Sequence, residues 1–424
     1  MFRKTTAPAA AAATDHTAGL SDRSLAETFL RLRSPSALAR AAGVCRRWRR
    51  VASSPAFLRL FRRLHPPPLL GFFVCNDGFT VNGALVGEVL NPTFFSSSNP
   101  APPPGLSGAV RRCAHFSLAS LPGADRWALA DTRDGLHLLR SRSDNRFHIP
   151  RQFVVCHPVT GRSALLPRRA QVYDDDDDGR DESAYLGAAL VLSDADAGAG
   201  GRLCFEVIVV TYFVYGLRLF VFSSHSGAWT AHPYSFSDIA GGGGVPPMPG
   251  SVGYAMHADG RVYWVVDSGG HAYLLALDTH TKAFSGIKLL SSMRERYEGN
   301  MRVVRSGGGG GELRMVALAD GLVLDLWRLD RSRSSRGRWV REARRELAYA
   351  QGVMGLIADA GIYRTSIMDA GEGFVFFKHF RSDRVFVLDL DAMVFTPLPH
   401  NEDCHDGLAL PYRMVLQPPF PVLG

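Results

Sequence analysis

Three stretches of this 424-residue sequence combine residue types that could perform chemistry. Residues 267–270 read Asp-Ser-Gly-Gly, which would suit a serine nucleophile beside a tight turn. One thiol and two imidazoles, in His400, Cys404 and His405, are ligand types that zinc takes. The aspartate run at 174–178 offers carboxylate oxygens to calcium. Each stretch needs further groups before it becomes a site.

None of the three stretches is accompanied by those groups. Val266 stands where the nucleophile loop of trypsin-like proteases has glycine, and no matching histidine motif lies upstream. The aspartate run lacks the alternating ligand spacing of a calcium loop, and the glycine run 307–311 lacks the Lys-Ser or Lys-Thr of a phosphate-binding loop. We interpret 267–270 as a turn between two strands and 400–405 as a structural loop. The sequence therefore predicts no catalytic residue, no metal and no cofactor.

Strand signals fill the chain from Leu69 onwards, and these strands would position any site. An acid-Gly turn followed by β-branched and aromatic residues, as at 134–135 and 259–260, is typical of a hairpin. The pattern recurs in five copies, which begin near Trp127, Cys204, Asp259, Asp320 and Glu372. Successive turns are roughly 50 to 65 residues apart, which suits a four-stranded propeller blade with long loops.

A sixth blade is expected from residues 69–116, together with a C-terminal strand at 412–416. Closing the ring in this way leaves no sheet edge unpaired. The sequence thus predicts an all-β propeller of about six blades over residues 66–424. A β-sandwich or an irregular set of antiparallel sheets is the alternative.

The segment from Leu20 to His65 has the pattern of four short amphipathic helices. Ser21 or Ser24 caps the first helix, and Ser-Pro pairs at 34–35 and 54–55 open the second and the fourth. The inner face of the third helix is expected to consist of Val44, Cys45, Trp48 and Val51. About 45 residues make too small a core to be stable alone, so this segment needs a partner, either another chain or the rest of this one.

This helical segment resembles an F-box in the form common in plants. The resemblance depends most on the Val-Cys-x-x-Trp-x-x-Val spacing at 44–51, and the one departure is Leu20-Ser21 where the family usually has Leu-Pro. The strand-rich part resembles the F-box-associated, kelch-like propeller domains. Together they imply an α+β multidomain chain with a disordered tail at 1–18, an F-box helical bundle at 19–65 and a propeller-like domain at 66–424.

An F-box binds a Skp-family adaptor, which connects it to a cullin-based ubiquitin ligase. The resemblance therefore implies the substrate-recognition subunit of a Skp–cullin–F-box ligase, with a protein target bound by the propeller and no enzymatic activity of its own. The adaptor-binding residues it implies are Leu20, Leu25, Leu32, Pro35, Leu38, Val44, Cys45 and Trp48.

Three alternatives stay open. The chain could be an F-box protein that acts outside a ligase, as the Leu20-Ser21 departure would allow. It could be a propeller sugar-binding protein or enzyme with a helical extension, which a polar cluster at the propeller centre would favour. The helices could also be a bundle that simply packs on the rest of the protein.

Composition limits the partners and the compartment. The net charge is +8, and arginines concentrate in the helical segment, where Asp22 and Glu27 are the only acids. Arginines on an outer helix face and attraction to an acidic partner explain this better than nucleic-acid contact, because aromatic residues do not interleave with them in the way that a base-stacking platform needs. The six cysteines form no C-x-x-C pair and no apolar run reaches 18 residues, so we expect a reducing compartment, cytoplasm or nucleus, and no membrane span.

Overall fold

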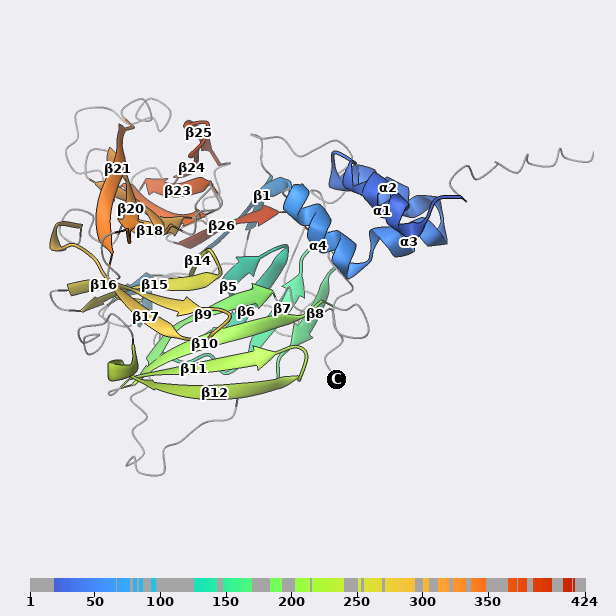
Figure 1. Ribbon diagram of the computed structural model, residues 1–424. Coiled ribbons are helices and arrows are strands. Elements are labelled where there is room, and N and C mark those ends of the chain that lie inside the picture. The colour runs from blue at the N-terminus through green and yellow to red at the C-terminus, as the bar shows by residue number, and fades with distance from the viewer. Residues whose placement is uncertain are drawn as a thin grey trace, which may run out of the picture. The chain divides into compact units, whose positions relative to one another are not determined.

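The computed structural model divides the chain into a helical unit, which includes the residues up to Pro67, and a strand-rich unit, which includes Pro68 to Val415 (Figure 1). The predicted tail 1–18, the aspartate and glycine runs at 174–178 and 307–311, and His400, Cys404 and His405 lie outside the described residues. The described residues are 19–65, 67–76, 79–81, 84–86, 93–96, 126–142, 148–169, 184–192, 203–213, 216–239, 251–252, 255–268, 271–293, 300–304, 312–319, 323–332, 337–347, 365–371, 373–379, 384–398, 407–413 and 415.

The helices begin where the sequence places a capping residue. Their bounds are α1 (Asp22–Leu30), α2 (Pro35–Val44), α3 (Arg46–Ala52) and α4 (Pro55–Leu64). Ser21 Oγ accepts from the N–H of Ser24 at 3.1 Å, so Ser21 rather than Ser24 is the first cap. Ser34 and Ser54 cap α2 and α4 in the same way, with proline in the first turn, and this confirms the two predicted Ser-Pro starts.

The junction between α2 and α3 differs from the prediction. Val44 is the last residue of α2 and is 64% exposed, so it does not line an inner face. Cys45 has extended backbone (φ −153°, ψ 170°), and its Sγ accepts from the N–H of Trp48 at 3.4 Å. The prediction that Val44 and Cys45 belong to the inner face of α3 was wrong, because the chain leaves the helix at Cys45 and uses the thiol as an N-cap.

The helical unit has its own small core. Phe29 is central to it, with its ring centroid 5.1 Å from that of Trp48 and 6.3 Å from that of Phe57. The buried side chains are Leu25, Phe29, Leu38, Val51, Ala52, Phe57, Leu58 and Phe61. The apolar faces of the four helices are therefore largely buried against one another.

The described strands of the second unit form six antiparallel blades and one separate hairpin. We number the blades along the chain. Blade 1 is β5 (Trp127–Arg133), β6 (Leu136–Ser141), β7 (Phe153–His157) and β8 (Arg162–Leu165); blade 2 is β9 (Ala184–Leu192), β10 (Phe205–Phe213), β11 (Gly216–Ser223) and β12 (Ala228–Ser235); blade 3 is β13 (Ser251–Val252), β14 (Met256–Ala258), β15 (Arg261–Ser268), β16 (His271–Asp278) and β17 (Phe284–Lys288). Blade 4 is β18 (Met301–Val304), β19 (Arg314–Ala319), β20 (Val323–Asp330) and β21 (Arg338–Glu346); blade 5 is β22 (Thr365–Gly371), β23 (Phe374–His379), β24 (Arg384–Asp389) and β25 (Val394–Pro397); blade 6 is β26 (Gly407–Arg413), β1 (Leu69–Asn76) and β4 (Thr93–Ser96); the hairpin is β2 (Phe79–Val81) with β3 (Ala84–Val86).

The architecture is a six-bladed β-propeller, and the prediction of about six blades is confirmed. Its sixth blade joins the two ends of the unit. Phe73 on β1 stands opposite Leu410 on β26 and opposite Phe94 on β4, so the first strand pairs on both sides (Figure 1, β1 in blue and β26 in red). The C-terminal strand begins at Gly407, five residues before the predicted start at Tyr412, and pairing it with β1 closes the ring.

Alternating side chains of each blade enter the two spaces between that blade and its neighbours. On β10, Val207 and Val209 pack with blade 1, whereas Ile208 and Val210 pack with blade 3. A strand buried on both faces has a continuous apolar run rather than an alternating pattern. This explains why β10 and β11 are apolar along most of their length.

Two of the predicted acid-Gly turns have the backbone that such turns require. Asp134 and Gly135 join β5 to β6 with φ of 47° and 83°, and Asp259 and Gly260 join β14 to β15 with φ of 48° and 74°. Positive φ at both central residues is the geometry of a type I′ hairpin, in which Asp-Gly is favoured. The predicted hairpin at 267–270 is also confirmed, since Ser268 on β15 stands opposite His271 on β16.

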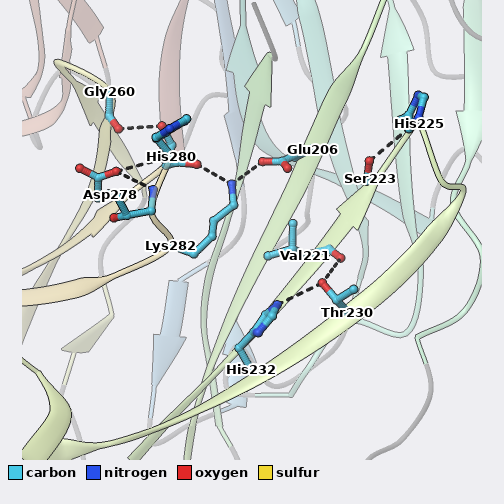
Figure 2. Close-up of polar contacts among 12 residues, drawn as sticks. Glu206, Val221, Ser223, His225, Thr230, His232, Gly260, Asp278, His280 and Lys282 are labelled. Carbon is cyan, nitrogen blue, oxygen red and sulfur yellow. Dashed lines mark hydrogen bonds and ion pairs between the residues drawn. The ribbon is translucent and has the colours of Figure 1, made fainter. Parts of the chain in front are cut away.

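Polar contacts also connect neighbouring blades at their outer side. Lys282, in the turn before β17, has a φ of 60° and directs its ammonium to the carboxylate of Glu206 on β10 (Figure 2). The hydroxyl of Tyr234 on β12 donates to the carbonyl oxygen of Lys282 at 2.7 Å. Blades 2 and 3 are thus connected by an ion pair and a hydrogen bond in addition to their apolar contact.

Candidate functional site

The inner strands of four blades surround a small pocket. It is lined from β5, β14, β22 and β26 and the turns beside them, and its volume is ≈ 60 Å³. A volume of this size holds a few water molecules or one small polar group. Its polar side chains are Asp131, Thr132, Arg133, Asp134, His257, Asp369 and Arg413. We call this the axial pocket.

Asp131 joins three blades at the axial pocket. Its side chain is buried, and its Oδ2 accepts from the backbone N–H of Leu190 on β9 at 2.7 Å. The same oxygen lies 2.7 Å from Nε2 of His257 on β14, which must carry the proton because a carboxylate only accepts. Oδ1 accepts from the N–H of Thr132 at 2.8 Å. Both oxygens of Asp131 are therefore engaged within the protein.

Asp369 occupies the equivalent place in blade 5. It is 6% exposed, and its Oδ1 accepts from the N–H of Ala370 at 2.8 Å. Burial raises the pKa of this carboxyl to about 7, against the opposing influence of the positive charge of Arg302. Arg302 on β18 donates to the carbonyl oxygens of Ile367 at 3.2 Å and Met368 at 3.0 Å. Its guanidinium thus holds the backbone just before Asp369.

A β-bulge precedes each of the two aspartates. The register of β5 with β6 shifts between Leu129 and Asp131, and that of β22 with β23 shifts between Ile367 and Asp369. A bulge inserts one residue and redirects the side chains that follow it. Both carboxylates line the axial pocket from corresponding positions, two residues before the last residue of their strand.

His137 lies behind the axial pocket and has a structural role. Its Nδ1 is 2.8 Å from the hydroxyl of Thr132, and its ring centroid is 4.3 Å from that of Phe73. Burial lowers the pKa of this imidazole to about 3, so it stays neutral over the physiological range. A neutral His137 packs between blades 1 and 6 rather than exchanging protons.

The sequence-predicted adaptor-binding residues divide into three groups in the helical unit. Leu25 and Leu38 are core residues and can only shape a surface from below. Leu32, Pro35, Cys45 and Trp48 are half-buried. Leu20 and Val44 are exposed, at 40% and 64%. Of the eight residues, only these last two are exposed apolar side chains.

Two further apolar side chains are exposed, contrary to the sequence pattern, which places Leu64 on the inner face of the last helix and does not single out Leu60. Leu60 and Leu64 on α4 are exposed, whereas Phe57, Leu58 and Phe61 of the same helix are buried. Their spacing of four residues places them on one helix face. This spacing is the sequence feature that indicates an exposed apolar face, because Leu60 and Leu64 lie on a different side of α4 from the residues that fill the core.

Within the described residues of the helical unit, the two acids, Asp22 and Glu27, are both paired on its surface. Asp22 lies 2.8 Å from Arg47 Nε and 2.9 Å from Arg50 Nη2, and these hydrogen bonds lower the pKa of its carboxyl. Glu27 lies 3.2 Å from Arg23 Nε. The remaining arginines leave this surface with an excess of positive charge.

No pattern in the sequence indicates the axial pocket. Asp131 and His257 are 126 residues apart and come together only through the closed ring.

Among the described residues, no group of three or more histidine, cysteine or acidic side chains is placed to hold a metal ion. No helix in the described part of the chain is long and apolar enough to cross a membrane.

No protein-family model and no curated protein sequence matches the chain. Solved structures match it at low identity. A chain of a nidogen/laminin complex is 10% identical with a TM-score of 0.36, over 68% of this chain and 84% of that one. The propeller domain of Cps50 (Swd1) from Myceliophteria thermophila is 9% identical with a TM-score of 0.30, over 65% and 90%. The Dos1 propeller is 12% identical with a TM-score of 0.29, over 66% and 60%. At these values the similarities carry no argument about function, and the propeller assignment depends on the sheets of this chain.

Proposed function

We propose that this chain is a non-enzymatic substrate-recognition subunit of a Skp–cullin–F-box ubiquitin ligase. In this proposal the helical unit binds a Skp-family adaptor and, through it, a cullin, and the propeller binds a protein target. The propeller fold is consistent with a protein-interaction scaffold. The observation that carries the proposal is that Leu20 and Val44 stay exposed at positions that the F-box resemblance assigns to the adaptor.

The closed core of the helical unit supports this reading. The inner apolar residues of this unit already contact one another. Val44, exposed at the end of α2, therefore adds nothing to the core of the unit. Exposed apolar side chains beside polar ones are what a partner surface offers. The positive potential around them would speed association with an acidic adaptor.

The mechanism we propose is proximity. A ligase subunit that holds a target beside a ubiquitin-charged enzyme raises the effective concentration of the two reactants. No catalytic side chain is required of the subunit itself. We place this activity in the cytoplasm or nucleus, in keeping with the free thiols of Cys45 and Cys156.

A binding experiment with exposed residues tests the proposal. We expect the full chain to bind a purified Skp-family adaptor in calorimetry, and Val44→Asp to weaken binding at least tenfold, because a carboxylate would be buried at the contact. Val394→Asp is the matched control, since Val394 is exposed on β25 of the propeller. Aspartate at Leu25 or Leu38 would unfold the helical unit and would test nothing about the contact.

Two results would remove the ligase proposal. One is failure of the wild-type chain to bind any Skp-family adaptor. The other is equal binding by wild type and Val44→Asp. The first would leave an F-box protein that acts outside a ligase as the better candidate.

The axial pocket favours a second candidate, a propeller that binds a small ligand. The observation is the buried Asp131–His257 pair beside Asp369. Ligand pockets for sugars or cofactors usually have about 300 to 1,000 Å³, far more than the ≈ 60 Å³ of this pocket. The pocket suits one functional group rather than a whole sugar, so we rank this candidate below the first.

A further inference from the structure

The axial pocket contains hydrogen-bond acceptors that the protein itself does not use. Asp369 is 6% exposed, and Oδ1 is engaged by the N–H of Ala370. In the part of the chain that the structure describes, no donor lies within hydrogen-bond distance of Oδ2. Because Asp369 as a whole is buried, the groups that can reach Oδ2 are those that enter the pocket it lines. Asp369 also lines the pocket, so a ligand there can supply the missing donor.

His257 adds a second acceptor to the same pocket. Its Nε2–H is committed to Asp131, so in the neutral imidazole Nδ1 carries a lone pair. Within the described residues Nδ1 has no hydrogen-bond partner. His257 and Asp369 both line the pocket, from β14 and β22. A ligand in the pocket would therefore meet two hydrogen-bond acceptors, Oδ2 of Asp369 and Nδ1 of His257.

The positive side chains of the axial pocket are engaged elsewhere. Arg133 Nε lies 3.7 Å from the carboxylate of Asp134. Arg413 lies over the ring of Phe374, with its guanidinium carbon 5.9 Å from the centroid. Arg302, the cation nearest to Asp369 on β18, donates to the backbone carbonyls of β22. Three aspartates against two arginines leave the pocket wall with an excess of negative charge when Asp369 is ionised.

We propose that the axial pocket binds a protonated amine or a guanidinium group, with Asp369 and His257 as its acceptors. This inference does not depend on the ligase proposal. The chemistry fits both a free small cation and the end of a lysine or arginine side chain. A head group fits the ≈ 60 Å³ volume, and the rest of such a ligand would stay outside. Charge-assisted hydrogen bonds to a carboxylate are the strong ones, so a single ionised Asp369 can dominate the affinity.

A pair of probes of the same shape tests the proposal on the wild-type chain. Methylguanidinium and methylurea differ mainly in charge and donor number. At about pH 8.5, where Asp369 is ionised, we expect methylguanidinium to bind at least tenfold more tightly than methylurea, with NMR shifts at Ala370 and His257. Equal binding of the two probes, or no binding of methylguanidinium, would overturn the proposal.

A variant pair then assigns the acceptor. Asp369→Asn is nearly isosteric, removes the charge and turns a donor toward the ligand, so methylguanidinium binding should fall at least tenfold. Asp391→Asn is the matched control, because Asp391 is exposed in the turn between β24 and β25 of the same blade and should leave binding unchanged. Unchanged binding in Asp369→Asn would show the acceptor to be wrong.

Two peptides show whether the bound cation is a protein side chain or a free small molecule. A capped Gly-Arg-Gly peptide that binds as tightly as methylguanidinium, while its citrulline counterpart does not, would identify a protein side chain as the occupant. Binding of methylguanidinium without the peptide would identify a free small cation. Both results support the cation site, and binding of the citrulline peptide as tightly as the arginine peptide would contradict it.

Discussion

Asp369 and His137 are both buried, and burial moves their pKa values in opposite directions. Burial disfavours the charged form of either group, so the carboxyl holds its proton to about pH 7 and the imidazole loses its proton above about pH 3. Both residues are therefore neutral in the folded protein near pH 6. In the unfolded chain near that pH, Asp369 would be ionised and His137 partly protonated.

We predict that Asp369 makes the protein less stable as the pH rises from about 4 to 7. The native carboxyl binds a proton in this window and the unfolded one does not, so the stability that it contributes is present below about pH 4 and is lost by about pH 7. The lost free energy of unfolding is of the order of 4 kcal/mol for a shift of this size. Urea unfolding at several pH values should show that Asp369→Asn removes this fall.

His137 gives the control of opposite sign. Its native pKa is depressed to about 3, so the unfolded chain binds the extra proton and stability falls as the pH drops below about 6.5. His137→Gln should therefore make the unfolding free energy less sensitive to acid, whereas Asp369→Asn should make it more sensitive. If both variants change the pH dependence in the same direction, our assignment of at least one buried group is wrong.

At the scale of elements, helix starts are the features that the sequence predicts best. Ser34 and Ser54 are strong caps in front of proline, and both act as predicted. The junction at Cys45 could not be predicted in the same way, because a thiol is a weak acceptor and is seldom a cap. The same stretch has a helical period on both sides, so Val44 and Cys45 were placed on an inner face that they do not form.

We predict that Cys45→Ala weakens α3 and that Cys45→Ser does not. The alanine has no acceptor for the N–H of Trp48, whereas the serine hydroxyl is a better acceptor than the thiol. Because the thiol bond is long, the expected cost is about 0.5 kcal/mol, or about twofold in the local opening constant. Hydrogen exchange of amides 46–52 measures it.

The amides of α4 are the internal control for this prediction. Ser54 caps α4 independently, so its exchange should not change in either variant. Slower or unchanged exchange of α3 in Cys45→Ala would mean that the thiol contact adds nothing to the helix.

The strands that the sequence predicts are those buried on both faces. β10, β15 and β16 are continuous apolar runs, and the repeat pattern found them. The sequence pattern misses the inner strands β9, β18 and β22, because small or polar residues interrupt their apolar runs. Asp369 on β22 and Gly187 on β9 are examples, and a Cβ at Gly187 would lie 2.3 Å from the indole nitrogen of Trp264. Asp369, which lines the axial pocket, is thus also a residue that weakens the strand signal.

At the scale of the whole molecule, the axial pocket exists only because the ring is closed. Asp131, His257 and Asp369 come from blades 1, 3 and 5, and no local sequence pattern relates them. The closing strand β26 also supplies Leu410, Pro411 and Arg413 to the pocket wall. Predicting the site would require the register of every blade, whereas predicting the fold required only the recurrence of strands and turns.

We predict that a chain ending at Asp406 loses both its stability and the axial pocket. Without β26, one side of β1 is unpaired, and the Tyr412 hydroxyl no longer donates to the Gly135 carbonyl at 3.2 Å to join blades 6 and 1. We expect the thermal midpoint to fall by more than about 10 °C and size-exclusion chromatography to show association through the open edge. A chain ending at Val415 keeps β26 and should behave as wild type. If the Asp406 chain remained monomeric with an unchanged midpoint, the five remaining blades would be stable without closure, and the cation site would then have to form without its β26 wall.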